Sequence, residues 1–180
     1  MKKNRYKIAI YGAVETHDCG LDVLDKAKII GKEISKKGHF VLTGGRHGFP
    51  QFVSMGAKEN RGEVIYFSPG ASLDEHVDIY RLDKNYADII IYTGFGYVGS
   101  SIFLTRSSDA VIIGCGKIDA IHEFTLAIQE GKPVGVLKGA WETDDVLRKI
   151  IGEKSISHLP VVFEEDPKVL VQKLLELIKN

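Results

Sequence analysis

The chain has little cysteine, no excess of charge of either sign and no long apolar run. Its two cysteines, Cys19 and Cys115, are too few for a disulfide framework and lack the paired spacing of a zinc site, so a reducing cytoplasm fits best. The 24 basic residues balance the 24 acidic ones, which disfavours nucleic acids and membrane surfaces as partners. No window approaches the roughly 20 apolar residues of a membrane span, and the apolar stretch 8–14 is too short and broken for a signal peptide. These absences predict a soluble, cytoplasmic protein.

The 180 residues suffice for one substantial hydrophobic core and are few for two, so we predict a single domain over 1–180. Short apolar runs alternate with longer stretches of helical period. The apolar runs predict strands at 7–12, 40–44, 63–67, 88–92, 110–113, 133–137 and 161–163. The periodic stretches predict helices at 22–37, 50–60, 99–107, 119–131, 143–151 and 167–179. This alternation predicts the α/β class, as a Rossmann-like three-layer sandwich with a mainly parallel sheet of about seven strands and helices on both faces.

Two further expectations concern burial. Most of the predicted strands are continuous apolar runs, which is typical of strands buried on both faces. The least regular part is the long connection 69–87, in which Asp74, Glu75, His76 and Asp78 precede the fourth strand. Long loops are often functional, but solvated charge is the commoner explanation for such a cluster.

A glycine-rich turn follows the second predicted strand. Gly44, Gly45 and Gly48 surround Arg46 and His47 between a buried strand and a helix start. Glycine permits positive φ and the close approach of a ligand, while a helix start presents N–H donors and the positive end of its dipole. The turn is therefore suited to an anion. The alternative is that the glycines only make a tight turn against a neighbouring helix, and the residues alone leave both interpretations open.

A second turn of this kind follows the fifth predicted strand and comprises Gly114, Cys115, Gly116, Lys117, Ile118 and Asp119. In it, Cys115 is best interpreted as a small residue in the place of a glycine. The first and fourth strands also run into glycine turns, at Gly12 with Ala13 and at Gly94 with Gly96. In open parallel sheets, ligands bind beyond the carboxyl ends of the strands, so these turns should lie at one edge. Together they predict a cleft of nucleotide or phosphate size.

These elements resemble the LOG-like family, also described as lysine decarboxylase-like or molybdenum-cofactor carrier-like, which includes cytokinin-activating nucleotide phosphoribohydrolases. The resemblance extends over 7–137 and is carried by Gly44, Gly45, Gly48, Gly56 with Ala57, the segments 64–69, 89–94 and 108–112, Glu123 and the segment 131–134. It implies a Rossmann-fold nucleotide-binding protein. It also implies a homodimer or larger assembly, in which helices near the cleft pack across a twofold axis.

The chain departs from this family where catalysis would be carried. The signature Pro-Gly-Gly-x-Gly-Thr-x-x-Glu falls on 115–123, so Asp119 and Ala120 stand at the Gly-Thr positions. The family's catalytic arginine aligns with Ser100, and a hydroxyl cannot replace a guanidinium. A carboxylate at this helix start repels a bound phosphate, and it also caps the first turn, which explains Asp119 without any ligand.

Glu123 matches the glutamate that the phosphoribohydrolases use near the ribose and is the one candidate catalytic residue; its simpler role is that of a first-turn acid favoured by the helix dipole. The cluster around His17 and Cys19 lacks a second ligand pair, so we predict no metal site. We expect a protein that binds a nucleotide, a pterin or another phosphorylated ligand, with a degenerate phosphoribohydrolase site and no required cofactor. The alternatives are a nucleoside 5′-monophosphate phosphoribohydrolase acting by N-glycosidic cleavage, and a molybdenum-cofactor carrier. Arg46 or Lys117 would then supply the missing positive charge.

Overall fold

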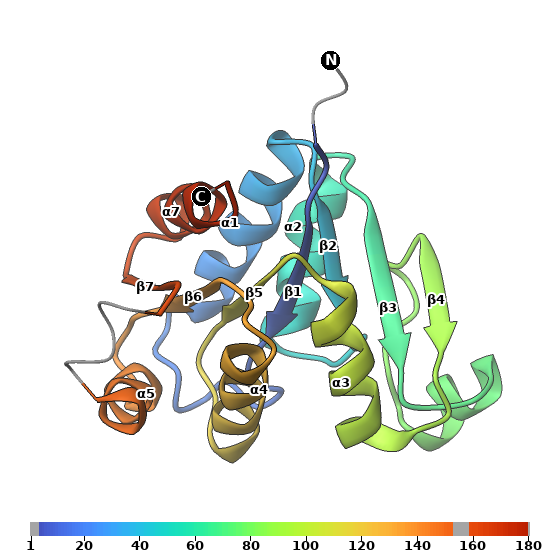
Figure 1. Cartoon of the computed structure of the whole chain (residues 1–180). Coiled ribbons are helices and arrows are strands. Elements are labelled where there is room, and N and C mark those ends of the chain that lie inside the picture. Colours follow the sequence, from blue (N-terminus) through green and yellow to red (C-terminus); the bar gives the residue numbers. More distant parts are fainter. Residues whose placement is uncertain (1–3, 153–158, 180) are drawn as a thin grey trace.

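The computed structural model describes residues 4–152 and 159–179. Seven strands form one sheet, with every neighbouring pair parallel, in the order β4-β3-β2-β1-β5-β6-β7 (Figure 1). The strands are β1 (Lys7–Tyr11), β2 (Phe40–Thr43), β3 (Val64–Ser68), β4 (Ile89–Tyr92), β5 (Ala110–Ile113), β6 (Val134–Leu137) and β7 (Val161–Glu164). The helices are α1 (Val23–Lys36), α2 (Phe49–Glu59), the π-helical turn η1 (Glu75–Ile79), α3 (Gly96–Ser107), α4 (Ile118–Gln129), α5 (Thr143–Ile151) and α7 (Pro167–Leu177).

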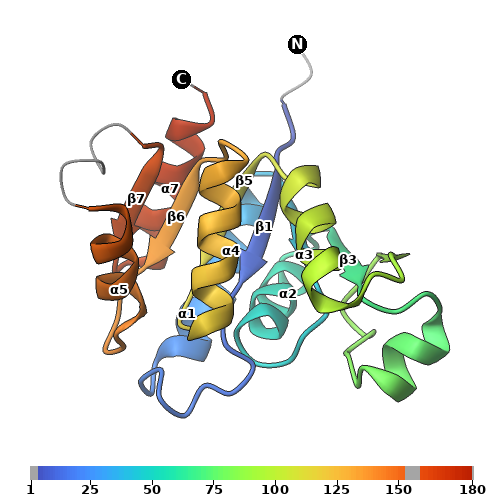
Figure 2. The ribbon, with the colours of Figure 1, turned by 60° about the horizontal axis from the view of Figure 1, so that its bottom comes forward.

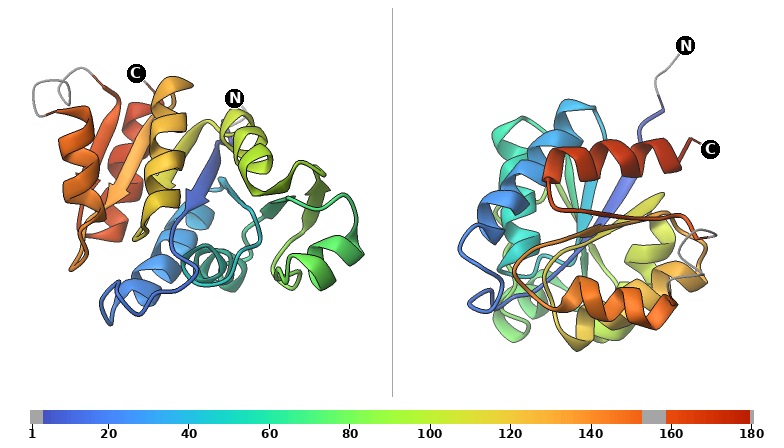
Figure 3. Two further views of the ribbon diagram at one scale, coloured as in Figure 1. Left: turned by 90° about the horizontal axis from the view of Figure 1, so that it is seen from below. Right: turned by 90° about the vertical axis from the view of Figure 1, so that its left-hand side faces the viewer.

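Helices cover both faces of the sheet (Figure 3). Helices α1, α2 and α7 pack on one face around a core that includes Ile30, Val53 and Leu174, and α3, α4 and α5 pack on the other around Leu104 and Phe124. The predicted Rossmann-like three-layer α/β sandwich is therefore confirmed. The largest boundary shift among the predicted helices is at α3, which begins at residue 96 rather than 99. In the described part of the chain, no helix has the length and apolar character needed to cross a membrane.

Helix α1 shows how the apolar period produces this arrangement. Val23, Ala27, Ile30 and Ile34 recur at spacings of three and four and are all buried against the sheet side of the helix. Just beyond the helix, Gly38 has a φ of 80°, in the left-handed region that ends helices and favours glycine. The spacing of the apolar residues therefore determines which face of α1 is buried, and Gly38 determines where the helix ends.

Strand β4 differs from the prediction of two-sided burial. It is the last strand on its side of the sheet and pairs with β3, and Ile89, Ile91 and Tyr92 are 56, 41 and 38% exposed. An apolar run cannot distinguish a central strand from an edge strand, because both use the same β-forming residues. Strand order, which tertiary packing decides, makes this difference.

The connection 69–87 is more ordered and less solvated than predicted. His76, in η1, is fully buried: one ring nitrogen lies 2.9 Å from the Ser68 hydroxyl and the other 2.9 Å from the Asp83 carbonyl oxygen. The Tyr66 hydroxyl donates a hydrogen bond to the Asp83 carboxylate at 3.1 Å. This buried polar network fastens the connection to β3, so solvated charge does not explain His76.

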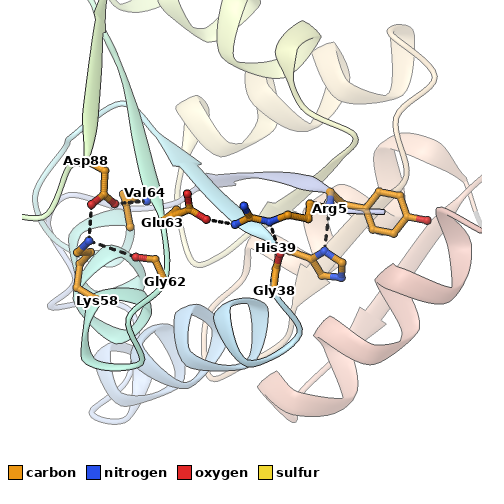
Figure 4. A network of polar contacts seen from close by, with 9 residues as sticks. Arg5, Gly38, His39, Lys58, Gly62, Glu63, Val64 and Asp88 are labelled. Carbon is orange, nitrogen blue, oxygen red and sulfur yellow. Dashed lines mark hydrogen bonds and ion pairs between the residues drawn. The ribbon is translucent and has the colours of Figure 1, made fainter. Parts of the chain in front are cut away.

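Polar side chains tie together the amino ends of the strands, at the edge opposite the glycine turns (Figure 4). Asp88 accepts a hydrogen bond from the Val64 backbone N–H at 2.8 Å and pairs with Lys58 at 2.6 Å. Arg5 pairs with Glu63 in the same network. Because each charged group here contacts a partner from another element, the network accounts for these residues as structural ties.

The carboxyl ends of the strands form an edge with a crevice, and this crevice follows from the strand order. From β1 the sheet continues through β2, β3 and β4 on one side and through β5, β6 and β7 on the other. The turns that leave β1, β2 and β5 meet at this edge, which comes forward in Figure 2. In open α/β sheets, such a reversal of direction opens the crevice in which ligands bind.

The ring of Phe49, at the start of α2, fills the space beneath these turns. It is fully buried, and a Cβ added at Gly12 or Gly114 would lie 2.7 or 2.5 Å from ring atoms. The Phe49 N–H donates to the Ala13 carbonyl, and the Gly114 N–H donates to the Tyr11 carbonyl, both at 2.9 Å. Glycine is needed at both positions because any side chain would displace the ring.

A disulfide joins the loop that follows β1 to the turn that follows β5. Cys19, between β1 and α1, is bonded to Cys115, after β5, and both residues are buried. The Ala13 N–H also donates to the Cys115 carbonyl at 2.6 Å. The interpretation of Cys115 as only a small residue in a glycine position is wrong. Two cysteines 96 residues apart carry no spacing signal, so only the fold brings them together.

Gly114→Ala should lower the free energy of unfolding by about 1 to 3 kcal/mol, because its Cβ overlaps the Phe49 ring in a filled core. Gly44→Ala is the matched control from the neighbouring turn, since its Cβ would meet its nearest atoms only at 3.8 Å. Urea denaturation measures both variants. Equal destabilisation by the two substitutions would contradict the packing explanation.

Reduction of the Cys19–Cys115 bond should also destabilise the protein, by up to about 4 to 5 kcal/mol, because the bond closes a loop of 96 residues in the unfolded chain. We expect the melting temperature to fall when a dithiol reductant is added and Cys19→Ser to melt at the same lower temperature with or without it. Alkylation of the non-reduced, unfolded protein followed by mass spectrometry measures the thiols. Two alkylated cysteines in protein purified without reductant would show that the bond does not form.

Candidate ligand-binding cleft

Two adjoining cavities lie at the carboxyl edge of the sheet. The larger, about 960 Å³, is a cleft between the turns after β1, β2, β5 and β6 and the connection 69–87, and charged side chains such as Arg81 share its walls with apolar ones such as Trp141. The smaller, about 240 Å³, lies between β1, β3 and the helices α3 and α4, and most of its wall is apolar. Arg46, Tyr97 and Asp119 line both cavities and so form the wall between them.

Most of the site residues predicted from the sequence line one of these cavities. Those in the larger cleft are Ala13, Arg46, His47, Cys115, Gly116, Lys117 and Asp119. Those in the smaller cavity are Gly12, Gly44, Arg46, Ser100, Ile118, Asp119 and Glu123. Among the predicted residues, those that line neither cavity are Gly45, Gly48, Gly94, Gly96, Gly114 and Ala120.

The glycines of the first turn are accounted for by packing. A side chain at Gly48 would strike the backbone carbonyls of Ala13 and Val14. The Gly45 N–H donates to the hydroxyl of Thr43 at 3.0 Å. The tight-turn interpretation thus explains these two glycines, whereas Gly44 faces the smaller cavity with room around it.

Asp119 is held at the start of α4 by groups of this chain. One carboxylate oxygen accepts hydrogen bonds from the backbone N–H groups of Lys117 at 3.3 Å and Ala120 at 3.0 Å. The other oxygen pairs with the Arg46 guanidinium at 3.3 Å, and that guanidinium lies over the Tyr97 ring, 5.3 Å from its centre. Asp119 is therefore not the N-cap residue that one interpretation predicted, because α4 begins at Ile118 after Lys117. Its side chain nonetheless satisfies N–H groups at the start of the helix, and in addition it neutralises Arg46.

Glu123 lies at the smaller cavity and is 5% exposed. Burial, and to a smaller extent the nearby Asp119 charge, raise the pKa of its carboxyl to about 8, against the lowering effects of Arg46 and of a 3.4 Å hydrogen bond from the Ser101 hydroxyl. Most of the Glu123 side chains are therefore protonated at pH 7. A neutral carboxylic acid donates a hydrogen bond but is a poor general base.

Helix α3 supplies no cation to this cavity, either from Ser100, which aligns with the family's catalytic arginine, or from Arg106. The Ser100 hydroxyl donates to the Tyr97 carbonyl of its own helix at 2.9 Å. Arg106, further along α3, pairs instead with Glu130 on the surface at 3.4 Å. Arg46 is thus the guanidinium nearest to Glu123 in the cavity wall.

Several cavity residues were not predicted. Tyr97 follows the fourth strand's glycine turn, and Trp141 and Thr143 follow β6, so the rule that ligands bind at carboxyl ends of strands, applied to β6 as well, would have found them. Arg81 also lines the cleft and has a φ of 53°, which is uncommon for a residue with a side chain. Its carbonyl lies 2.8 Å from a ring nitrogen of His47, and this contact gives no signal in the sequence.

Lys117 and the residues around His17 lie on the rim of the larger cleft. Lys117 pairs with Asp18 at 2.9 Å, and Asp18 lies 3.2 Å from His17. The pairing lowers the pKa of Asp18 and raises that of Lys117, so both are charged at neutral pH. In 4–152 and 159–179, no group of three or more His, Cys, Asp and Glu side chains is arranged to hold a metal ion.

Comparison with known proteins gives the family. Residues 5–171 match the SLOG cluster4 family. An uncharacterized protein of Archaeoglobus fulgidus is 30% identical over 132 residues, which are 73% of this chain and 82% of that protein. The molybdenum cofactor binding protein of Rippkaea orientalis has a similar structure, with a TM-score of 0.77 and 27% identity over 98% of this chain and 96% of its own. The molybdenum cofactor carrier protein of Chlamydomonas reinhardtii shares the fold, with a TM-score of 0.78 and 24% identity over 98% of this chain and all of its own.

The family match spans all seven strands of the sheet, and the Rippkaea orientalis structure covers 98% of the chain, in agreement with the LOG-like motifs in the glycine turns. The chain therefore belongs to the SLOG cluster4 family, within the LOG-like and molybdenum-cofactor carrier-like proteins.

Proposed function

We propose that the protein binds a nucleotide- or pterin-like small molecule and does not cleave it. The observation that carries this proposal is the pair of cavities at the sheet's switch point. One is small and mainly apolar, the other is large and has both charged and apolar groups in its walls, and Arg46, Tyr97 and Asp119 lie between them. The larger volume falls in the range of roughly 300 to 1,000 Å³ that is typical of small-molecule sites. A ligand with a flat apolar part and a polar part matches both cavities at once.

The smaller cavity is the proposed place for the heteroaromatic ring. Phe67, Pro69 and Leu104 give it apolar walls, and the buried Glu123 carboxyl supplies one directional polar group. A protonated carboxyl donates to a ring nitrogen or a carbonyl oxygen, which both purines and pterins possess. The polar part of the ligand would extend into the larger cleft, toward Arg81.

The same residues argue against cleavage of an N-glycosidic bond. The hydroxyl of Ser100 bonds to its own helix, Ala120 carries no hydroxyl, and Glu123 is mainly protonated at neutral pH. The described residues around the smaller cavity thus offer neither an unpaired guanidinium or ammonium for a ribose phosphate, since Arg46 is paired with Asp119, nor a charged carboxylate at Glu123 to stabilise a ribosyl cation. We therefore propose a degenerate phosphoribohydrolase site that binds without catalysis and needs no further cofactor.

The relatives favour a pterin among the candidate ligands. The Rippkaea orientalis protein is described as binding the molybdenum cofactor, and this chain is 27% identical to it over almost its whole length. A role as a carrier of that cofactor is the second candidate for this chain. The balanced charge still argues against nucleic acid as a partner. A cytoplasmic location also stays our prediction; stable disulfides inside cells are known from hyperthermophiles.

The proposed assembly is a homodimer or larger. Beside the exposed apolar side chains of β4, helix α3 exposes Val98 and Phe103 to 64 and 45%, and Phe95, just before the helix, is 67% exposed. Val98 also lines the smaller cavity, so a second copy packed on α3 would lie beside the ligand. An exposed strand edge next to an apolar helix face is a surface that proteins normally cover.

Calorimetric titration with nucleoside monophosphates, dinucleotides and pterins tests the binding proposal. We expect at least one class to bind and no free base to be released. Because Glu123 loses its proton above a pKa of about 8, affinity should fall about tenfold between pH 7 and pH 9, whereas Glu123→Gln should bind with little pH dependence. A folded protein that binds nothing in this panel contradicts the proposal, and so does release of base that Glu123→Gln abolishes.

Light scattering tests the assembly. We expect a mass of at least twice the 19.9 kDa of one chain. Phe103→Glu places a charge in the exposed surface of α3, so we expect this variant to shift to the monomer. Val169→Glu on α7 is the control, since Val169 is similarly exposed, at 38%, on the other face of the sheet. A monomeric wild-type protein, or equal dissociation of both variants, would exclude α3 as the contact.

A further inference from the structure

In the turn between β5 and α4, four backbone N–H groups donate to oxygen atoms of the chain itself. The Gly114 N–H donates to the Tyr11 carbonyl at 2.9 Å, and the Gly116 N–H donates to the Thr143 hydroxyl at 3.1 Å. The N–H groups of Lys117 and Ala120 both donate to Asp119. A phosphate that used these four donors would have to displace these oxygens first.

Asp119 makes the contacts that a bound anion makes. Its carboxylate lies in the first turn of α4, where the helix dipole favours negative charge, and it pairs with the Arg46 guanidinium at 3.3 Å. The two side chains are 35 and 31% exposed, so each is largely withdrawn from solvent. The negative charge at this position is thus supplied by the protein, and the nearest guanidinium is already neutralised.

We propose that Asp119 determines ligand specificity: it acts as a built-in anion that excludes phosphomonoesters from the start of α4 and favours a neutral or N–H-donating ligand group there. The inference rests on the proposed function, because it concerns what the same cleft accepts. It goes beyond that function in assigning a residue to the choice between ligands.

The surrounding charges act in the same direction. The field of Asp119 reaches into the smaller cavity, where it adds to the rise in the pKa of Glu123. On the rim, Lys117 is paired with Asp18. A dianionic phosphate placed at the start of α4 would therefore meet a carboxylate without a free cation beside it, and like charges at contact distance repel strongly in a partly buried site.

Calorimetry with inorganic phosphate, AMP and adenosine tests the assignment on the full-length protein. Wild type should bind phosphate weakly and should not prefer AMP over adenosine. Asp119→Ala removes the charge and uncovers the two N–H groups, so its affinity for phosphate should rise at least tenfold. Asp119→Asn removes the charge but keeps an oxygen for the N–H groups, so its gain should be smaller.

Asp25→Ala is the matched control, because Asp25 is an exposed acid in the first turn of α1 and lines neither cavity. It should bind phosphate as wild type does. Circular dichroism shows whether each variant is folded, and Asp119→Asn, which keeps a capping oxygen, serves if Asp119→Ala is not. A folded Asp119 variant without any gain in phosphate affinity, or an equal gain in Asp25→Ala, would overturn the assignment.

The results also separate this inference from the proposed function. If wild type binds no nucleotide or pterin but Asp119→Ala gains phosphate, the role of Asp119 stands and the proposed ligand class is wrong. If wild type binds a panel ligand and Asp119→Ala gains no phosphate, the binding function stands and Asp119 is only a helix cap.

Discussion

The packing of one aromatic ring against two glycines determines where the other parts of the cleft lie. Phe49 is fully buried at the start of α2, with its ring against Gly12 at the end of β1 and Gly114 at the end of β5. Because a filled core transmits small displacements, a shift of this ring would move all three elements. The cleft walls are the loops that leave these elements, and the disulfide between Cys19 and Cys115 holds two of those loops together above the ring.

The glycine-rich turns thus have the backbone shape of an anion-binding site, but the groups around them do not favour a bound anion. Glycines that would admit a phosphate admit instead the Phe49 ring or a neighbouring backbone, and three of the N–H donors after β5 bond to the side chains of Asp119 and Thr143. What stays accessible is the boundary between a mainly apolar cavity and a larger cleft with charged groups in its walls, and Arg46, Tyr97 and Asp119 form this boundary. This arrangement is better suited to recognising the shape and hydrogen-bonding groups of a ligand than to holding a transferred or leaving group.

The two edges of the sheet differ in the role of their polar groups: those at the amino edge pair with one another, and those at the carboxyl edge line the cleft. At the amino edge, ion pairs such as Lys58 with Asp88 link the starts of neighbouring strands and leave the charged groups satisfied (Figure 4). At the carboxyl edge, polar groups from four turns face a common space. Buried polar networks such as that of His76 rigidify the connection between these edges, since a buried donor without a partner would be costly.

The sequence by itself determined the local elements. Alternating apolar and periodic runs fix the strands and helices, because the period of a buried face depends only on neighbouring residues, and the glycine turns follow from the same local pattern. Of the candidate ligand-binding site, the sequence predicted only the glycine turns and not the contacts between them. That Cys19 meets Cys115, that Arg46 meets Asp119 across 73 positions and that β4 lies at an exposed edge was decided by tertiary structure. These features depend on strand order and on contacts between distant segments, which no local pattern encodes; the same holds for the protonated state of Glu123, which burial produces.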